Sequence, residues 1–186
     1  MTLIRSFSAL AIAAAALAAA PAQANSLTFQ GVTFETLALD ANTLELDILN
    51  ATHATGDWAG IGYIKAFSIK DVGTITGASL AGWTENSKEL SANGCRTGNS
   101  GGACFTHTPA LALTDSMSFV IHFTGTSLHF DNPHLKVEFL SGPNDTRKTG
   151  SLLSMNIPAV PEPETYAMLL AGLGAVGFVA RRRRQG

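Results

Sequence analysis

Residues 118–124 read SFVIHFT, and this stretch decides how the middle of the chain folds. Its large apolar side chains, Phe119, Ile121 and Phe123, recur at every second residue, so they share one face of an extended strand. Residues 43–48, TLELDI, alternate in the same way. A period of two is typical of a strand with one buried face and one solvated face, so the sequence predicts a β-sheet here.

Further strands are predicted on both sides of this stretch. Alternating or β-branched runs lie between turn signals at 40–42, 55–57 and 141–145, and no segment there sustains the 3.6-residue apolar period of a helix. Several short strands with polar turns predict an all-β fold, an antiparallel β-sandwich that is jelly-roll-like. Residues 86–108 are expected to be the longest irregular region. The predicted strands are residues 32–37, 61–69, 72–75 and 135–139, with edge strands at 27–30 and 151–154.

The N-terminal residues have the organisation of a secretory signal peptide. Arg5 precedes an alanine-rich apolar stretch, and residues 22–24 read AQA, a small-x-small cleavage pattern. The sequence predicts a signal peptide at residues 1–24, which signal peptidase removes by cutting between Ala24 and Asn25. The alternative is an uncleaved anchor, but the apolar stretch is short for a membrane span.

Charge is distributed unevenly along the 186-residue chain, whose formal net charge is -2. Four arginines stand together near the C-terminus, so the predicted exported domain, residues 25–159, is mildly acidic. A negatively charged domain repels polyanions. We therefore expect no nucleic-acid partner.

The two cysteines, Cys95 and Cys104, both lie in the predicted exported domain. Export to an oxidising compartment favours a disulfide between them, closing the glycine-rich loop that separates them. A zinc site would need two further ligands at suitable spacing, so no metal is predicted for this pair.

The C-terminal residues combine a short apolar segment with a basic cluster. Residues 165–180 contain no charged side chain, and as a transmembrane helix they would be about 24 Å long, against a hydrocarbon core of about 30 Å. Such a helix is short for a permanent anchor. By the positive-inside rule the basic cluster stays in the cytoplasm and the domain lies outside. The cluster consists of Arg181, Arg182, Arg183 and Arg184.

The tripeptide Pro161, Glu162, Pro163 stands directly before this segment. The tripeptide, the short helix and the arginine cluster together resemble the PEP-CTERM sorting signal, here residues 160–186. The resemblance implies an exported bacterial protein, usually Gram-negative, that a membrane-embedded exosortase processes near the tripeptide. It also implies that the catalytic residues of this processing belong to exosortase. The two prolines keep the tripeptide extended and remove backbone donors, as suits a segment that a processing enzyme must grip.

Three patterns suggest catalysis or cofactor binding, and each has a simpler explanation. Residues 172–177 spell G-x-G-x-x-G, but inside an apolar helix, where no dinucleotide loop forms. Ser100 lies in GNSGG, which a flexible disulfide loop explains without a nucleophile. Glu45 and Asp47 share a strand face at a spacing that suits paired carboxylates, and equally a solvated face. We expect no catalytic residue, so the protein is predicted not to be an enzyme.

Metal ligands are sparse in the sequence. His129 and His134 flank a turn that contains Asp131, but no spacing matches an established zinc pattern. Residues 131–132 and 144–145 could contribute oxygen ligands to calcium, as loops of β-sandwiches do. We therefore predict no cofactor other than this possible calcium.

Trp58 and Trp83 are candidate stacking platforms for sugars, although packing in the core explains such rings as well. The sequence as a whole predicts a cell-surface or extracellular-matrix protein, associated with exopolysaccharide or biofilm. During maturation it would pass through the inner membrane and meet signal peptidase and exosortase. The alternative is a carbohydrate-binding module or weak hydrolase that acts on extracellular polysaccharide.

Overall fold

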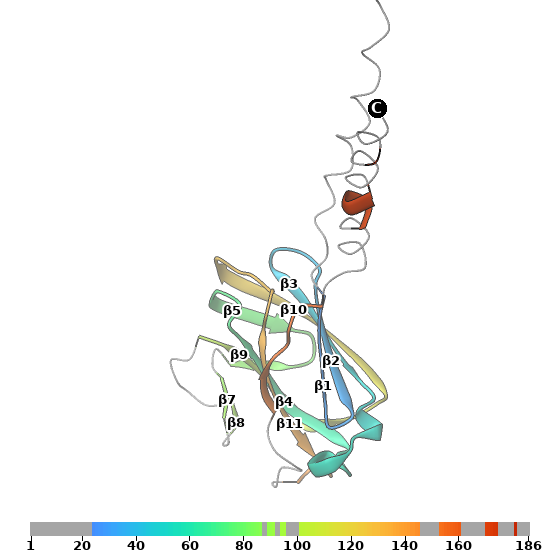
Figure 1. Ribbon diagram of the computed structural model, residues 1–186. Helices are drawn as coiled ribbons and strands as arrows, with labels where there is room; N and C mark the ends of the chain where they lie inside the picture. The colour runs from blue at the N-terminus through green and yellow to red at the C-terminus, as the bar shows by residue number, and fades with distance from the viewer. Residues whose placement is uncertain are drawn as a thin grey trace, which may run out of the picture.

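The described residues form two large antiparallel sheets and a separate two-stranded one (Figure 1). The computed structural model describes residues 24–86, 89–91, 94–95, 101–145, 153–160, 170–174 and 181. Each large sheet has five strands, all antiparallel to their neighbours. The first contains, in spatial order, β1 (Ala24–Phe29), β2 (Val32–Ala38), β3 (Thr43–Leu49), β10 (Ser116–Thr126) and β5 (Thr74–Leu80).

The second sheet and the smaller elements complete the fold. In spatial order the second sheet contains β12 (Leu153–Asn156), β11 (His134–Leu140), β4 (Tyr63–Lys70), β9 (Ala103–Ala112) and β6 (Thr84–Asn86). A two-stranded hairpin pairs β7 (Leu90–Ser91) with β8 (Gly94–Cys95), and two 3₁₀ turns, η1 (Ala51–His53) and η2 (Gly56–Trp58), follow β3.

One apolar cluster lies between the two large sheets and holds them together. Phe119, Ile121 and Phe123 of β10 are at most 6% exposed, so the face that the alternating sequence predicted is the buried one. Phe67 and Leu135 contribute to the same cluster from the second sheet. Burying such side chains stabilises the fold by about 1.5–3 kcal/mol each relative to leaving them in water. The prediction of an all-β, antiparallel fold is confirmed.

The chain passes repeatedly from one sheet to the other. After β3 it crosses to β4 in the second sheet, returns to β5 in the first, and crosses again to β6 and β9. It then returns to β10 and ends in β11 and β12 of the second sheet. Consequently β1 and β12, the first and last strands, lie at the edge of different sheets.

Most of the strands predicted from the sequence overlap observed strands, but the predicted strand 72–75 lies partly in the bend before β5, residues 151–152 lie outside the described residues, and the prediction for residues 86–108 is wrong in part. Strand β9 already begins at Ala103 and pairs with β4 on one side and β6 on the other. Its period is interrupted where four residues, from His107 to Ala110, stand opposite Lys65 alone. This bulge contains Pro109, which cannot donate to a ladder and obscures the strand in the sequence.

The β7–β8 hairpin covers part of the outer face of the second sheet. The predicted disulfide joins Cys95 of the hairpin to Cys104 of β9, with an S–S distance of 1.99 Å. Leu90 is fully buried beside Ala66, and its N–H donates to Ser68 Oγ at 3.1 Å. Among the described residues, a covalent bond, an apolar contact and a hydrogen bond therefore fix the hairpin to the second sheet.

An ion-pair cluster lies next to the hairpin. The Glu89 carboxylate contacts the ammonium groups of Lys70, at 3.0 Å, and Lys136. Partial burial raises the pKa of Glu89, but the attraction of Lys136 and Lys70 outweighs it, so the pKa of this carboxyl lies below its ordinary value. Glu89 thus stays ionised and links the hairpin segment to β4 and β11.

We predict that reducing the disulfide lowers the free energy of unfolding by about 2–3 kcal/mol, because the open chain regains loop entropy. Urea unfolding of the purified protein with and without reductant measures the change. The Cys95→Ser, Cys104→Ser double variant is the control, since it should show the lower stability in both conditions. Equal stability of the reduced and oxidised protein would contradict the prediction.

Candidate processing site

The two ends of the domain meet at the free edge of β1. Val160 N–H donates to Ala24 O at 2.9 Å, and Ser26 N–H donates to Pro158 O at 3.1 Å. Between these two bonds, Asn25 and Ala159 form an antiparallel bridge. We call residues 24–26 and 158–160 the terminal junction. It brings the predicted signal-peptidase site next to the residue that precedes the Pro-Glu-Pro tripeptide.

Asn25 anchors the N-terminal side of the terminal junction. Its side chain occupies the inward face of β1 and is 1% exposed, where an amide needs hydrogen-bond partners. Asn25 Nδ2 donates to Thr36 Oγ1 at 3.0 Å and to Phe130 O at 2.8 Å. Asn25 Oδ1 is buried with no hydrogen-bond partner in the part of the chain that the structure describes. The two donated bonds fix the start of β1 to β2 and to the loop before β11.

The C-terminal side is fixed by the second sheet. Strand β12 pairs with β11, and the next residue, Ile157, is fully buried and donates its N–H to Pro133 O at 2.9 Å. Val160 is 46% exposed, although its N–H is bonded. The C-terminal segment of the domain is therefore attached to both sheets up to Val160.

Most of the predicted sorting signal lies outside the described residues. The undescribed part of the sorting signal includes Pro161, Glu162 and Pro163, and also Arg182, Arg183 and Arg184. Residues 1–23 of the predicted signal peptide lie outside the described residues as well. Residues 170–174 and Arg181 are helical and exposed. Within the described ranges, no helix combines the length and apolar character needed to cross a membrane. The predicted transmembrane helix at 165–180 stays a prediction.

Comparison with known families identifies the C-terminal residues. The family model of the PEP-CTERM protein-sorting motif matches residues 159–184. The match begins at Ala159, which is bridged to Asn25 in the terminal junction. Comparisons with curated proteins and with solved structures gave no significant match.

The chain therefore carries a PEP-CTERM sorting motif, as its sequence predicted. This motif supports an exported protein that exosortase processes and that reaches the cell envelope or surface.

The two tryptophans predicted as sugar platforms differ in exposure. Trp58 is fully buried, and its ring makes edge contacts with Phe29, Phe34 and Phe139 at centroid distances of 5.1–6.1 Å. It has no free ring face, so its predicted role in glycan contact is wrong for this structure. Trp58 packs in the core instead, which was the other explanation of this ring.

Trp83 keeps part of its surface exposed. Its ring packs against Phe67 and Phe119 on the core side, and against His107 at a centroid distance of 5.2 Å. The indole is therefore held rigidly while one part of it remains accessible.

The carboxylates considered for catalysis lie on the outer face of the first sheet. Glu45 accepts a hydrogen bond from Ser118 Oγ at 2.6 Å, and Asp47 stands opposite Glu35 in the register of β2 and β3. Both side chains are half-buried. This is the geometry of a solvated strand face. Ser100 lies outside the described residues.

The histidines are distributed over several elements. His134 Nδ1 lies 2.7 Å from Asn156 Oδ1, and His134 Nε2 lies 3.1 Å from Ser154 Oγ, so this ring bridges β11 and β12. Among the residues that the structure places, no three His, Cys, Asp or Glu side chains gather as metal ligands. Asp145 accepts a hydrogen bond from Ser141 Oγ at 2.8 Å. The calcium prediction stays a prediction.

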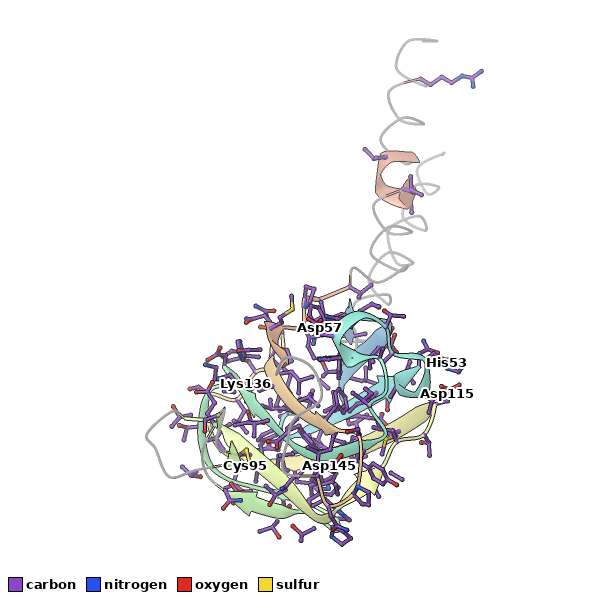
Figure 2. The ribbon with its side chains drawn as sticks, turned by 90° about the horizontal axis from the view of Figure 1, so that it is seen from below. His53, Asp57, Cys95, Asp115, Lys136 and Asp145 are labelled. Carbon is purple, nitrogen blue, oxygen red and sulfur yellow. A yellow bond between two sulfur atoms is a disulfide. The ribbon has the colours of Figure 1, made fainter. Side chains whose placement is uncertain are left out.

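A cluster that the sequence did not reveal joins η1 to the start of β10. His53 lies next to Asp115 (Figure 2), with His53 Nδ1 2.9 Å from Asp115 Oδ1. Thr52 Oγ1 donates to the same oxygen at 2.5 Å. The hydrogen bonds from Thr52 and then His53 hold the pKa of Asp115 below its ordinary value. No spacing rule could have found this cluster, because it depends on how distant segments fold together.

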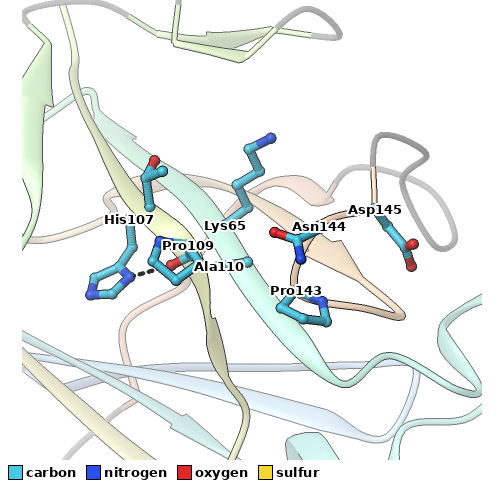
Figure 3. Close-up of a pocket in the computed structure, with 8 residues that line it drawn as sticks. Lys65, His107, Pro109, Ala110, Pro143, Asn144 and Asp145 are labelled. Carbon is cyan, nitrogen blue, oxygen red and sulfur yellow. Dashed lines mark hydrogen bonds between the residues drawn. The ribbon is translucent and has the colours of Figure 1, made fainter.

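The bulge in β9 borders a pocket of about 320 Å³ on the second sheet (Figure 3). It combines cationic, amide and carboxylate groups with apolar walls, and His107 Nδ1 lies 2.6 Å from Pro109 O. His107 also connects the pocket to Trp83. Its lining residues are Lys65, His107, Thr108, Pro109, Ala110, Pro143, Asn144 and Asp145.

We predict that Asn25→Ala lowers the free energy of unfolding by about 1–3 kcal/mol, because Thr36 and Phe130 each lose a buried donor. Urea unfolding of the purified protein measures this. Ser26→Ala is the matched control, since the neighbouring side chain lies on the outer face of β1 and should change stability by less than about 0.5 kcal/mol. Equal effects of the two substitutions would contradict the anchoring role of Asn25.

Proposed function

We propose that this chain is a non-enzymatic surface or extracellular-matrix protein of a Gram-negative bacterium, delivered by sequential processing at its two ends. Signal peptidase removes residues 1–24, and the tail holds the precursor in the inner membrane. Exosortase then cuts near Pro161, Glu162 and Pro163. The two-sheet domain, residues 25–159, which we class as a jelly-roll-like sandwich, joins the exopolysaccharide-rich matrix or the cell surface.

The observation that carries this proposal is the hydrogen bond of 2.9 Å between Val160 and Ala24. An exported precursor with a cytoplasmic N-terminus and cytoplasmic arginines leaves the membrane after residue 24 and re-enters it after residue 160. Both ends of its domain must then lie at the same outer boundary. The terminal junction meets this requirement, because it brings both ends together at one edge of the domain.

We include no catalytic role in the proposal. The grouping that most resembles a catalytic dyad is His53 with Asp115, and their side chains are 73% and 58% exposed. Solvent water competes for both groups, whereas acid–base catalysis generally uses a site from which most water is excluded. The cluster is better explained as a surface link between η1 and β10.

We predict that replacing Pro161, Glu162 and Pro163 with alanine makes the precursor accumulate in the membrane fraction, because the processing enzyme loses its recognition element. Immunoblots of membrane and medium fractions from the native host measure the ratio of precursor to mature protein. Mass spectrometry of the mature C-terminus locates the cut.

The chain offers a matched control for this experiment. Glu162→Gln tests the acidic residue inside the tripeptide, and Glu164→Gln removes the same charge two residues later. We expect slower processing of the first variant and normal processing of the second. Normal maturation of the triple-alanine variant would contradict the proposed sorting route.

A second candidate function, binding of extracellular polysaccharide, is favoured by the pocket beside Trp83. A partly exposed indole supplies an apolar surface, and Lys65, Asn144 and Asp145 supply donors and acceptors of the kind that fix sugar hydroxyls. His107 both contacts the indole and lines the pocket, so it connects the two.

If this surface binds sugars, Trp83→Ala and His107→Ala should each weaken binding to a glycan array or to the host exopolysaccharide by at least about tenfold. Val120→Ala, on the outer face of the first sheet, is the control and should bind as the unmodified protein does. If binding survives both the Trp83 and the His107 substitution, or if no binding is detected, the polysaccharide-binding function is contradicted and only the structural role remains.

A further inference from the structure

Lys65 is set apart from the rest of β4 by a register break on both of its sides. On one side the pairing with β11 passes from Ala66–Glu138 to Ile64–Phe139, so no residue of β11 stands opposite Lys65. On the other side Lys65 faces the four-residue bulge of β9. Bulges re-aim a side chain and are over-represented next to active sites. Here the re-aimed side chain lines the pocket of about 320 Å³ (Figure 3).

The ammonium group of Lys65 lacks an anionic partner. In the part of the chain that the structure describes, no ion pair joins it to a carboxylate. The other two lysines that the structure describes, Lys70 and Lys136, lie on the same sheet, and both contact Glu89. Lys65 is half-buried, and removing a cation from water costs free energy unless an anion compensates for it. The pocket therefore has a place for an anionic group of a ligand.

The other polar groups of the pocket are already oriented. Asp145 Oδ2 accepts a hydrogen bond from Ser141 Oγ at 2.8 Å, which fixes this carboxylate. His107 Nδ1 lies 2.6 Å from Pro109 O, and because a carbonyl oxygen only accepts, this ring nitrogen carries the hydrogen. Nε2 of the neutral ring is then an acceptor. Asp145 and His107 thus offer acceptors to hydroxyl groups, whereas Lys65 offers donors to an anion.

We propose that this pocket selects a sugar unit that carries a carboxylate group, such as a uronic acid. The inference rests on the proposed polysaccharide-binding function and names its ligand class. Lys65 donates to the carboxylate of the sugar, and the acceptors of His107 and Asp145 take its hydroxyl groups. The apolar face of the sugar ring packs on the partly exposed ring of Trp83, which His107 connects to the pocket.

The charge of the whole domain restricts the ligand further. Residues 25–159 are mildly acidic, so a polymer with a carboxylate on every unit is repelled at long range. A neutral chain with isolated carboxylates is repelled far less and still supplies one anion to Lys65. The size of the pocket agrees, since 320 Å³ lies near the lower end of the roughly 300–1,000 Å³ of small-molecule sites. The ligand is therefore an acidic unit in an otherwise neutral sugar chain.

Calorimetric titration of the protein purified from its native host tests this ligand class. One probe is an oligosaccharide that contains a single glucuronate unit. The matched probe is the same oligosaccharide after its carboxylate has been reduced to an alcohol. We expect the acidic probe to bind at least about tenfold more tightly, as a hydrogen bond between charged groups implies. The same sugar chain with glucuronate at every unit should bind more weakly than the probe with one.

Substitutions at lysine assign this preference to one side chain. Lys65→Met removes the charge and keeps an apolar side chain of similar length, so the tenfold preference should disappear. Its binding of the reduced probe should stay nearly unchanged, which also shows that the variant is folded. Lys65→Arg keeps the charge and should retain most of the preference. Lys136→Met removes the same charge from the same sheet outside the pocket, so this matched control should keep the preference.

The possible results separate this inference from the function on which it rests. Equal affinity of the unmodified protein for the two probes would overturn the inference and leave polysaccharide binding in place. A preference that persists in Lys65→Met, or that is lost in Lys136→Met, would overturn it too, because the discrimination would not arise at Lys65. Tighter binding of the fully charged chain would contradict the restriction to isolated carboxylates. If neither probe binds, polysaccharide binding is contradicted, and the inference with it.

Discussion

The pairing between β1 and residues 158–160 is the constraint on which the organisation of this protein depends. Two backbone hydrogen bonds and one antiparallel bridge join the beginning of the first sheet to the segment that follows the second. The buried amide of Asn25 fixes one partner, and the buried side chain of Ile157 fixes the other. A domain closed in this way brings the start of β1 next to residue 159, where the match to the sorting motif begins.

Much of the fold could be predicted because its strands obey a simple rule. Where one face is buried and the other solvated, apolar side chains must recur at every second residue, as Phe119, Ile121 and Phe123 do. The disulfide was predictable for a different reason, since only two cysteines are present and the chain is exported. The sorting motif depends on local order along the chain rather than on the fold, so it too could be read directly.

The remaining features depend on contacts between distant residues, which no local pattern encodes. Strand β9 was missed because Pro109 interrupts its alternation, and only its pairing with β4 reveals a bulged strand. Trp58 follows an acidic residue in a glycine-rich stretch that suggests exposure, yet three phenylalanines from other strands enclose it. The terminal junction was invisible for the same reason, because neither Ala24 nor Val160 carries a side chain that specifies its partner.

The repeated passage of the chain between the two sheets has a consequence for the time course of folding. Because β3 pairs with β10 and β4 with β11, most neighbours in space are remote in sequence, and the contact order is high. Domains of this topology fold in milliseconds to seconds, more slowly than a chain of about this length rich in local helices. The first sheet cannot reach its final strand order until β10 is available, and the second sheet cannot do so until β11 and β12 are. The Cys95–Cys104 disulfide lies on the second sheet, where it joins the β7–β8 hairpin to β9 before β11 and β12 follow along the chain.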